Sequence, residues 1–163
     1  AQTASIAVQS ALTGHLLFST LHTNRAPAAI TRLIDMGVEK FLISSSLLAV
    51  LAQRLVRKLC TECKCVDESD ASHKVFGLEA NKTIYEPVGC KSCNFTGYSG
   101  RVAIGELFII DDEIKEYLKT DVDDTTLMKL AVKNGMISLD KQLRMMLENG
   151  DTSVAEAVRI GIK

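Results

Sequence analysis

Four cysteines with matched spacing are the residues whose types and positions most directly suggest chemistry. Cys60-Thr61-Glu62-Cys63 and Cys90-Lys91-Ser92-Cys93 are two C-x2-C pairs separated by 26 residues. Two intervening residues let both sulfurs of one turn face a single ion, so two such turns can complete a tetrahedral S4 site. Soft thiolates favour zinc or an iron–sulfur cluster over hard cations. We expect a structural zinc ion, because four protein ligands leave no position open for a substrate.

Disulfides or unpaired thiols are the alternatives for these residues. The chain has five cysteines, which cannot all pair internally. A Cys63-x-Cys65 pair could replace Cys60, although the matched spacing favours Cys60 and Cys63. Cys65 is then a spare thiol that is open to oxidation. Four basic residues beside the ligands could offset the negative charge of a zinc–thiolate site: Arg57, Lys58, Lys64 and Lys91.

A second group of polar residues follows a short apolar run near the start of the chain. The run Leu16–Leu21 is bounded by polar residues, as is typical of a buried parallel strand, and His22-Thr23-Asn24 comes directly after it. Ligands of open α/β sheets bind beyond the carboxyl ends of the strands. His22 is therefore a candidate to hydrogen-bond a phosphate oxygen. The alternative is a histidine that only caps the next helix or has its partners in a loop.

The elements that must position these residues mix helices and strands. The apolar pattern predicts helices over 1–13, 24–36 and 41–57, with a strand over 16–21, and Gln53–Leu59 could be extended instead. Asn24 is the expected cap of the second helix, with Pro27 in its first turn. The later part predicts a strand over 101–110 and helices over 112–119, 124–133, 138–148 and 153–161. Ser153 and Glu156 have the spacing of a capping box. This order indicates part of an α/β domain whose other strands lie elsewhere.

The composition excludes several classes of protein. Apolar residues make up 47% and charged residues 24% of the chain, which is typical of a globular domain and not of a disordered one. The longest apolar-leaning run, Phe41–Ala52, is well short of the ~18 residues of a membrane span. The net charge is +4 over residues 1–59 and −5 over residues 60–163, without a polybasic arm. Nucleic acid is therefore not an expected partner.

Three segments carry a resemblance to a known family. Gly14–Asn24 closely resembles the histidine box of the secretion ATPase superfamily. Leu51–Cys60 and Gly89–Leu107 resemble segments of the bacterial type II secretion and type IV pilus assembly ATPases, the general secretory pathway protein E type among them. The order also matches: histidine box, Gln-Arg-Leu-Val-Arg, four cysteines, Gly-Tyr-x-Gly-Arg, helical tail. The likeness covers essentially the whole chain, and type II secretion and pilus assembly remain alternatives because their motifs overlap.

The resemblance implies a fold, cofactors and partners. It implies the C-terminal part of an α/β RecA-like ATPase domain over 1–59, a tetracysteine zinc-binding module over 60–100, and a strand with a helical C-terminal subdomain over 101–163. The whole protein would be a cytoplasmic hexamer that binds ATP and Mg²⁺ between subunits. It would associate peripherally with platform proteins of the inner membrane and power protein secretion.

The resemblance also implies roles for particular residues. His22 matches the position near the terminal phosphates, and His15 matches a residue that supports the histidine box. Arg32 and Arg101 match arginines thought to face the nucleotide or a neighbouring subunit. His73 matches no motif and is expected to be an exposed surface residue. The four cysteines of the two pairs match the metal ligands: Cys60, Cys63, Cys90 and Cys93.

Phosphoryl transfer needs a phosphate-binding loop, G-x-x-x-x-G-K-[ST], and the sequence contains none. The resemblance implies that this loop and the Walker acids lie upstream of Ala1, and we therefore expect residues 1–163 alone neither to bind ATP tightly nor to hydrolyse it. Leu107–Glu113 looks like a Walker B strand, but we expect Asp111 to cap the next helix instead. An alternative function is a zinc-ribbon interaction module without ATPase ancestry. A module of this kind that binds nucleic acid would need aromatic stacking residues, and the aromatic content of only 5% counts against it. The zinc unit and the helical tail could also mainly mediate protein contacts.

Overall fold

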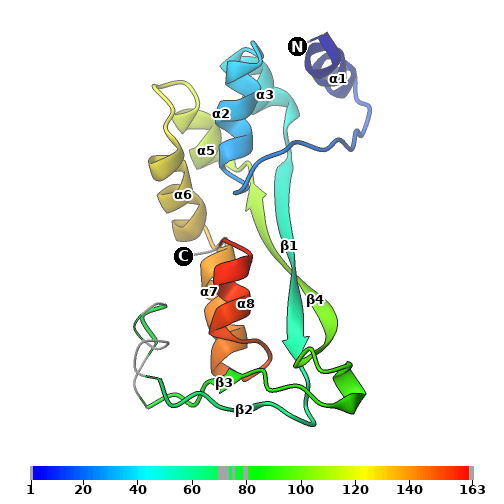
Figure 1. The fold of residues 1–163 in the computed structure, drawn as a ribbon. Helices are drawn as coiled ribbons and strands as arrows, with labels where there is room; N and C mark the ends of the chain where they lie inside the picture. Colours follow the sequence, from blue (N-terminus) through cyan, green and yellow to red (C-terminus); the bar gives the residue numbers. More distant parts are fainter. Residues whose placement is uncertain (1, 70–73, 75, 79–80, 162–163) are drawn as a thin grey trace. The chain divides into compact units, whose positions relative to one another are not determined.

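The computed structural model describes residues 2–69, 74, 76–78 and 81–161. His73, the histidine that matched no motif, lies outside the described residues. The described elements are helices, one 3₁₀ turn and short or paired strands (Figure 1). In chain order they are α1 (Gln2–Leu12), α2 (Ala28–Asp35), α3 (Lys40–Ser46), β1 (Ala49–Leu59), β2 (Cys65–Val66), β3 (Tyr85–Glu86), η1 (Lys91–Cys93), β4 (Tyr98–Ile109), α5 (Asp112–Tyr117), α6 (Asp124–Lys133), α7 (Leu139–Glu148) and α8 (Val154–Arg159).

The chain folds into two compact units, each made of two separate stretches. Unit 1 comprises Ala1–Ala52 and Glu106–Ile137, and unit 2 comprises Gln53–Gly105 and Ser138–Lys163. The strands β1 and β4 pair with each other and each contributes residues to both units. The unit boundaries therefore fall inside these strands, whereas the sequence placed boundaries after residues 59 and 100. The three-part division stays a prediction.

Unit 1 is mainly helical. Its helix α3 contacts α1, α2 and α5, and α5 in turn contacts α6. The apolar faces of these helices and the adjoining parts of β1 and β4 bury one core, because each face hides its apolar area only against the others. The residues of this core that are buried are Ala26, Ile30, Val38, Ile43, Ala52, Phe108, Ile110, Ile114, Leu118, Leu127, Ala131 and Met136.

Unit 2 contains the cysteines and the last two helices. Its antiparallel pair β2–β3 sets Cys65 opposite Glu86 and Val66 opposite Tyr85. Helix α8 contacts β3. Leu139, Leu143 and Leu147 recur at four-residue spacing, so they lie on one face of α7, and all three are buried. This face belongs to a core that also contains Val56, Phe76, Leu78, Ile84, Ile104 and Ala157.

The predicted C-terminal helices are confirmed, and their caps are side chains. Asp111, Asp123, Ser138 and Ser153 accept backbone N–H groups at the starts of α5, α6, α7 and α8. Asp111 caps α5 by accepting the N–H of Ile114 at 2.9 Å, as the sequence predicted. Ser153 accepts the N–H of Glu156, but the Glu156 carboxylate binds arginines instead of completing the capping box.

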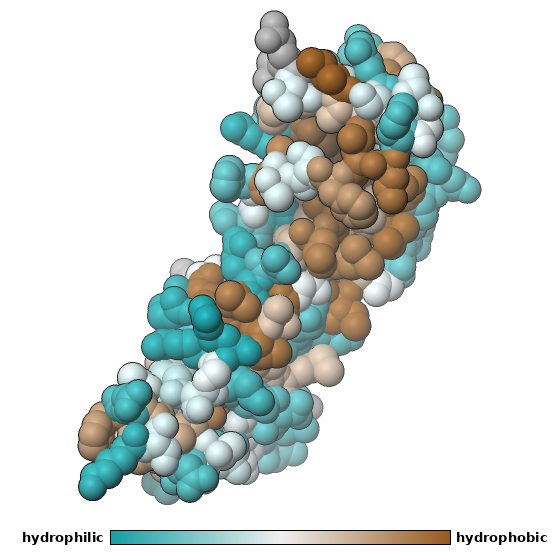
Figure 2. All heavy atoms as spheres, turned by 90° about the vertical axis from the view of Figure 1, so that its right-hand side faces the viewer, coloured by the Kyte–Doolittle hydropathy of each residue, from teal (hydrophilic) through white to brown (hydrophobic). Residues whose placement is uncertain are grey.

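The strand predicted over 16–21 is wrong. Residues 15–23 have no regular structure, and Phe18 is 91% exposed. A strand needs a hydrogen-bonded neighbour, and both sheets of the described residues are two-stranded pairs that do not include this segment. On the face of the molecule that Figure 2 shows, apolar side chains gather over unit 1. The exposed large apolar residues of unit 1 include Leu16, Leu17, Phe18, Leu21, Leu48, Leu51, Leu107 and Ile109.

The helix predicted over 41–57 is correct only in its first part. Helix α3 ends at Ser46, and β1 begins at Ala49, so the alternative of an extended Gln53–Leu59 is confirmed. The apolar spacing from Ile43 to Arg54 fits a helix, but pairing with β4 supplies hydrogen bonds that the local pattern cannot reveal. The start of α2 also differs, because this helix begins after Pro27 without a side-chain cap, so Asn24 is not its cap.

In the described part of the chain, every helix falls short of the length and apolar character that a bilayer-spanning helix needs.

Candidate functional site

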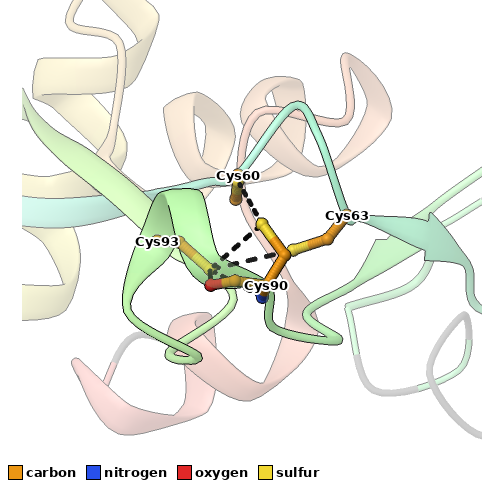
Figure 3. Close-up of side chains that lie close together, drawn as sticks. All are labelled: Cys60, Cys63, Cys90 and Cys93. Carbon is orange, nitrogen blue, oxygen red and sulfur yellow. Dashed lines mark hydrogen bonds between the residues drawn. The ribbon is translucent and has the colours of Figure 1, made fainter.

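The four sulfurs of the two C-x2-C pairs come together in unit 2 (Figure 3). The sulfur atoms of Cys60, Cys63, Cys90 and Cys93 all lie within 4.8 Å of one another. Three of the separations are 3.9 Å for Cys60–Cys90, 3.8 Å for Cys63–Cys93 and 3.9 Å for Cys90–Cys93. Sulfurs at the corners of a tetrahedron with Zn–S bonds of about 2.3 Å lie about 3.8 Å apart. The sulfurs are thus spaced as ligands of one ion and not as disulfides, whose S–S bond is about 2.05 Å.

Two tight turns carry the sulfurs. Cys60 follows the end of β1, and the turn is closed by bonds from the N–H groups of Cys63 and Lys64 to the Cys60 carbonyl. The second turn contains η1 and closes in the same way, with the N–H groups of Cys93 and Phe95 donating to the Cys90 carbonyl. The two turns are tied together by the Cys60 N–H, which donates to the Gly97 carbonyl at 2.9 Å. Backbone hydrogen bonds within and between the two turns therefore hold the four cysteines close together.

Backbone N–H groups point at the sulfurs. Cys93 Sγ accepts from the N–H groups of Cys90 and Gly97, both at 3.2 Å, and Cys63 Sγ accepts from Gly89 at 3.3 Å. The hydrogen bonds from Cys90 and Gly97 hold the pKa of Cys93 at about 6 against the opposing effect of burial. Burial raises the pKa of Cys63 to about 12, and the sulfurs beside it add to this effect. In the metal-free protein Cys93 thus forms a thiolate more readily than Cys63, and a bound cation would favour the thiolate form of its ligands.

Two of the four basic residues beside the cysteines, Arg57 and Lys64, have other contacts in the structure. Arg57 binds Glu156 and lies over the Tyr98 ring, 4.1 Å from its centroid. Lys64 donates to the Gly150 carbonyl at 2.7 Å and lies over the Tyr85 ring. The sequence suggested that Arg57 and Lys64 would offset the negative charge of the thiolates. Backbone N–H groups that donate to the sulfurs supply part of this compensation instead.

Cys65 is not a member of the four-sulfur group. It lies on β2, exposed, and its thiol donates to Glu86 Oε1 at 3.4 Å. Partial desolvation, followed by the neighbouring Glu86 carboxylate, raises the pKa of Cys65. The alternative pairing of Cys63 with Cys65 is thus not the one that the structure forms, and the raised pKa disfavours the reactive thiolate.

The residues present fit a zinc ion. The donor set is four thiolate-forming side chains at tetrahedral separations, two of them buried. Such a set is closed, because no ligand position is left for water or substrate. Zinc bound by Cys60, Cys63, Cys90 and Cys93 would contribute folding free energy and perform no reaction step.

The structure places both predicted histidines of unit 1 in the irregular segment before α2. His22 is exposed, and so is His15, whose Nδ1 lies 3.1 Å from Thr13 Oγ1. Arg32 lies on α2 and is exposed, and Arg101 lies on β4 in unit 2 and is also exposed. The roles assigned to His15, His22, Arg32 and Arg101 by resemblance therefore stay predictions.

Two fully buried glutamates were not identified as candidates in the sequence. Glu106 on β4 accepts the Ala26 N–H at 2.7 Å in unit 1, and Glu156 on α8 binds Arg57 in unit 2. The signal for Glu106 was available, since a charged residue occurs at an inward position of an alternating strand. No such pattern indicated that Glu156 is buried, because its three-residue spacing from Ser153 predicts a helix-capping role instead.

Comparisons with known proteins find the same groups of proteins that the sequence motifs resemble. The family model described as "Type II/IV secretion system protein" matches residues 1–159. The Type II secretion system protein HxcR of Pseudomonas aeruginosa is 45% identical over 98% of this chain and 31% of its own length. The Type II secretion system ATPase E of Vibrio cholerae is 44% identical over 98% of the chain and 32% of its own length. The Type IV pilus assembly ATPase TfpB of Acinetobacter baylyi is 41% identical over 97% of the chain and 28% of its own length. The chain thus spans about a third of the length of the curated relatives that it matches.

Proposed function

Because the chain belongs to the type II/IV secretion system protein family, we propose that it is the C-terminal portion of a hexameric ATPase that powers type II protein secretion. The observation that carries this proposal is the 45% identity to a type II secretion protein over 98% of the chain. A relative of similar identity is named as an ATPase of this system. The chain accounts for about a third of these proteins, so the ATPase activity belongs to the whole protein.

The exposed apolar residues of unit 1 support a larger protein around the chain. Leu16, Phe18, Leu51 and Leu107 are each at least half exposed, at 70%, 91%, 59% and 50%. Large apolar side chains gathered in this way are typical of a surface that another part of a protein covers. A RecA-like sheet completed by an upstream half, with the phosphate-binding loop and the Walker acids, would supply such a cover.

The four-cysteine site takes a structural zinc ion in this proposal, and ATP with Mg²⁺ binds to the whole protein. His22 lies near the terminal phosphates, His15 supports the segment that carries it, and Arg32 and Arg101 face the nucleotide or a neighbouring subunit. The protein acts in the cytoplasm, where it associates with inner-membrane platform proteins. Nucleic acid is not among its partners, because the charge and aromatic content of the chain do not favour it.

Kinetics on the intact protein test the motor proposal. We expect Mg²⁺-dependent ATP hydrolysis by the intact protein, none by residues 1–163 alone, and a loss of about tenfold or more in kcat for His22→Asn. His15→Asn is the matched control, and its loss should be smaller because His15 does not approach the phosphates. An intact, assembled protein without ATPase activity would rule the proposal out, and metal-independent turnover by residues 1–163 would contradict the assignment of activity to the whole chain.

Pilus assembly is the second candidate, because the pilus ATPase of Acinetobacter baylyi is nearly as similar as the secretion proteins. Genetic complementation separates the two functions. We expect the intact gene to restore secretion of an exoprotein to a strain that lacks its type II secretion ATPase, and not twitching motility to a strain that lacks its pilus ATPase. The opposite result would assign the protein to pilus assembly.

A further inference from the structure

Glu106 is a carboxylic acid at a position where the strand pattern calls for an apolar side chain. At the end of β4 the exposed residues Leu107 and Ile109 alternate with the buried residues Glu106 and Phe108, and Ile110, directly after the strand, is also buried. Glu106 is fully buried. Burial of a carboxylate is costly unless its oxygens are paired, whereas an apolar residue at this position would pack without that cost. The contacts of Glu106 must therefore account for its presence in the core.

Both oxygens of the Glu106 side chain bind the same short segment of unit 1. Oε1 accepts the N–H of Ala26 at 2.7 Å, and Oε2 lies 3.5 Å from Nη1 of Arg25. Ala26 is fully buried, and the Arg25 side chain is 30% exposed. A strand residue 80 positions away thus holds two consecutive residues of the irregular segment by a backbone contact and a side-chain contact.

This segment connects His22 to α2, and Figure 1 shows it turning into that helix beside the end of β4. Residues 15–23 have no regular structure, and Pro27, at the start of α2, provides no side-chain cap. The contacts at Arg25 and Ala26 therefore hold the backbone shortly after His22. A backbone held three and four residues further along restricts the positions that the His22 imidazole can reach.

We propose that Glu106 is a positioning residue, whose buried carboxylate fixes the segment His22–Ala26 so that His22 is presented to the nucleotide. The part of this proposal that concerns the nucleotide rests on the proposed ATPase function. The part that concerns the segment does not, because the contacts lie within unit 1. A purely structural role for Glu106 would stabilise all of unit 1 equally, whereas a positioning role acts locally on the segment.

Amide hydrogen exchange of the 163-residue chain tests the local effect. Glu106→Leu fills the core position but removes both contacts, and we expect exchange at the Ala26 amide to become about tenfold faster while the amides of Leu118 and Leu127 change little. Glu106→Gln keeps an oxygen for the Ala26 N–H and loses the charge, so its effect is smaller and in the same direction. Glu113→Gln, which removes a partly exposed ion pair with Lys133 in the same unit, should not change exchange at Ala26. An equal increase at all three amides, or no increase in either Glu106 variant, would overturn the proposal.

Steady-state kinetics of the intact ATPase test the link to His22. We expect Glu106→Leu to lower kcat about tenfold with a KM for ATP within about twofold of the parent value, because binding remains while orientation is lost. Glu106→Gln should have a smaller loss of kcat, and Glu113→Gln none. A loss confined to KM, or no loss, would refute the positioning role. If the parent protein hydrolyses no ATP, the proposed function fails, while the exchange experiment still decides whether Glu106 fixes the segment.

Discussion

Arg57 and Glu156 are joined by three nitrogen–oxygen contacts although 99 residues separate them. The Arg57 backbone N–H donates to Glu156 Oε1 at 2.9 Å, and its Nε and Nη2 lie 2.8 and 2.6 Å from Oε2. The Glu156 side chain is fully buried, and Arg159 of the same helix binds both of its oxygens as well. One carboxylate therefore ties α8 to the end of β1, next to the turn that carries Cys60 and Cys63.

Replacing Glu156 should destabilise unit 2. In Glu156→Ala the guanidinium groups of Arg57 and Arg159 lose their shared partner, and we expect a loss of about 3 kcal/mol in the free energy of unfolding. Urea denaturation followed by circular dichroism measures this loss. Glu148→Ala is the control in the same unit, and it should change stability by less than about 0.5 kcal/mol, because this residue lies at the C-terminal end of α7. Equal losses of unfolding free energy in Glu156→Ala and Glu148→Ala would disprove the stabilising role of the buried Glu156 carboxylate.

The same carboxylate should make stability depend on pH in the acid range. Burial alone would raise the pKa of Glu156, but hydrogen bonds from Arg159 and Arg57 outweigh it and lower the pKa from 4.5 to about 2. Since the folded-state pKa is depressed, this stabilisation is present above pH 4.5 and is lost as the pH falls toward 2. The fall in the pKa of Glu156 from 4.5 to about 2 corresponds to about 3 kcal/mol in the free energy of unfolding.

Comparison of the parent chain with Glu156→Gln checks this dependence. We expect the difference in urea midpoint between the two proteins to be largest above pH 4.5 and to vanish near pH 2, because a protonated glutamate resembles glutamine. A difference that stays constant over this range would show that the charge of Glu156 contributes nothing.

Metal binding should depend on Cys63 and not on Cys65. The chain purified with zinc should hold about one ion per chain, and Cys63→Ser should hold close to none, because three thiolates remain of the four-sulfur group. Cys65→Ser is the matched control, since Cys65 lies two residues away, outside that group, and its variant should keep the ion. Mass spectrometry under native conditions measures the ratio. Loss of zinc from Cys65→Ser with retention in Cys63→Ser would mean that the ligand set is wrong.

Two glycines with similar backbone angles should respond differently to alanine. Gly97 (φ +76°) and Gly100 (φ +78°) both adopt left-handed conformations, which cost an L-residue roughly 1–2 kcal/mol. A Cβ on Gly97 would also lie 2.4 Å from Pro87 Cβ, whereas a Cβ on Gly100 meets nothing within 4 Å. We therefore expect Gly97→Ala to destabilise unit 2 by clearly more than Gly100→Ala in thermal denaturation, and to weaken zinc binding because the Gly97 N–H donates to Cys93 Sγ. Similar melting temperatures for the two variants would contradict the close approach of Gly97 to Pro87.

Asp111 should behave as a helix cap and not as a metal-binding acid. Asparagine caps helices about as well as aspartate, so Asp111→Asn should leave stability nearly unchanged, whereas Asp111→Ala should cost about 1 kcal/mol. In the intact protein, Asp111→Asn should retain the Mg²⁺-dependent ATP hydrolysis that we propose for it. A large loss of activity in this variant, with stability unchanged, would restore the Walker B interpretation of Leu107–Glu113.

The sequence by itself determined the features that depend on neighbours along the chain. The two-residue spacing within each cysteine pair indicated turns that gather sulfurs, and the structure brings these four sulfurs together. Asp111 and Ser153 were identifiable as caps because a cap acts on an N–H group three residues away. The later helices and β4 were predictable for the same reason, since their apolar periodicity is a local pattern.

Only the tertiary structure decided the features that depend on distant partners. Residues 49–52 become strand instead of helix because β4 pairs with them, and 16–21 stays irregular because neither sheet of the described residues includes it. Glu106 and Glu156 are both buried, and the partners that compensate their charge could not be identified from the sequence because they lie 80 and 99 residues away. Strand pairing and the burial of charge are settled by groups that only folding brings into contact, and no local pattern contains them.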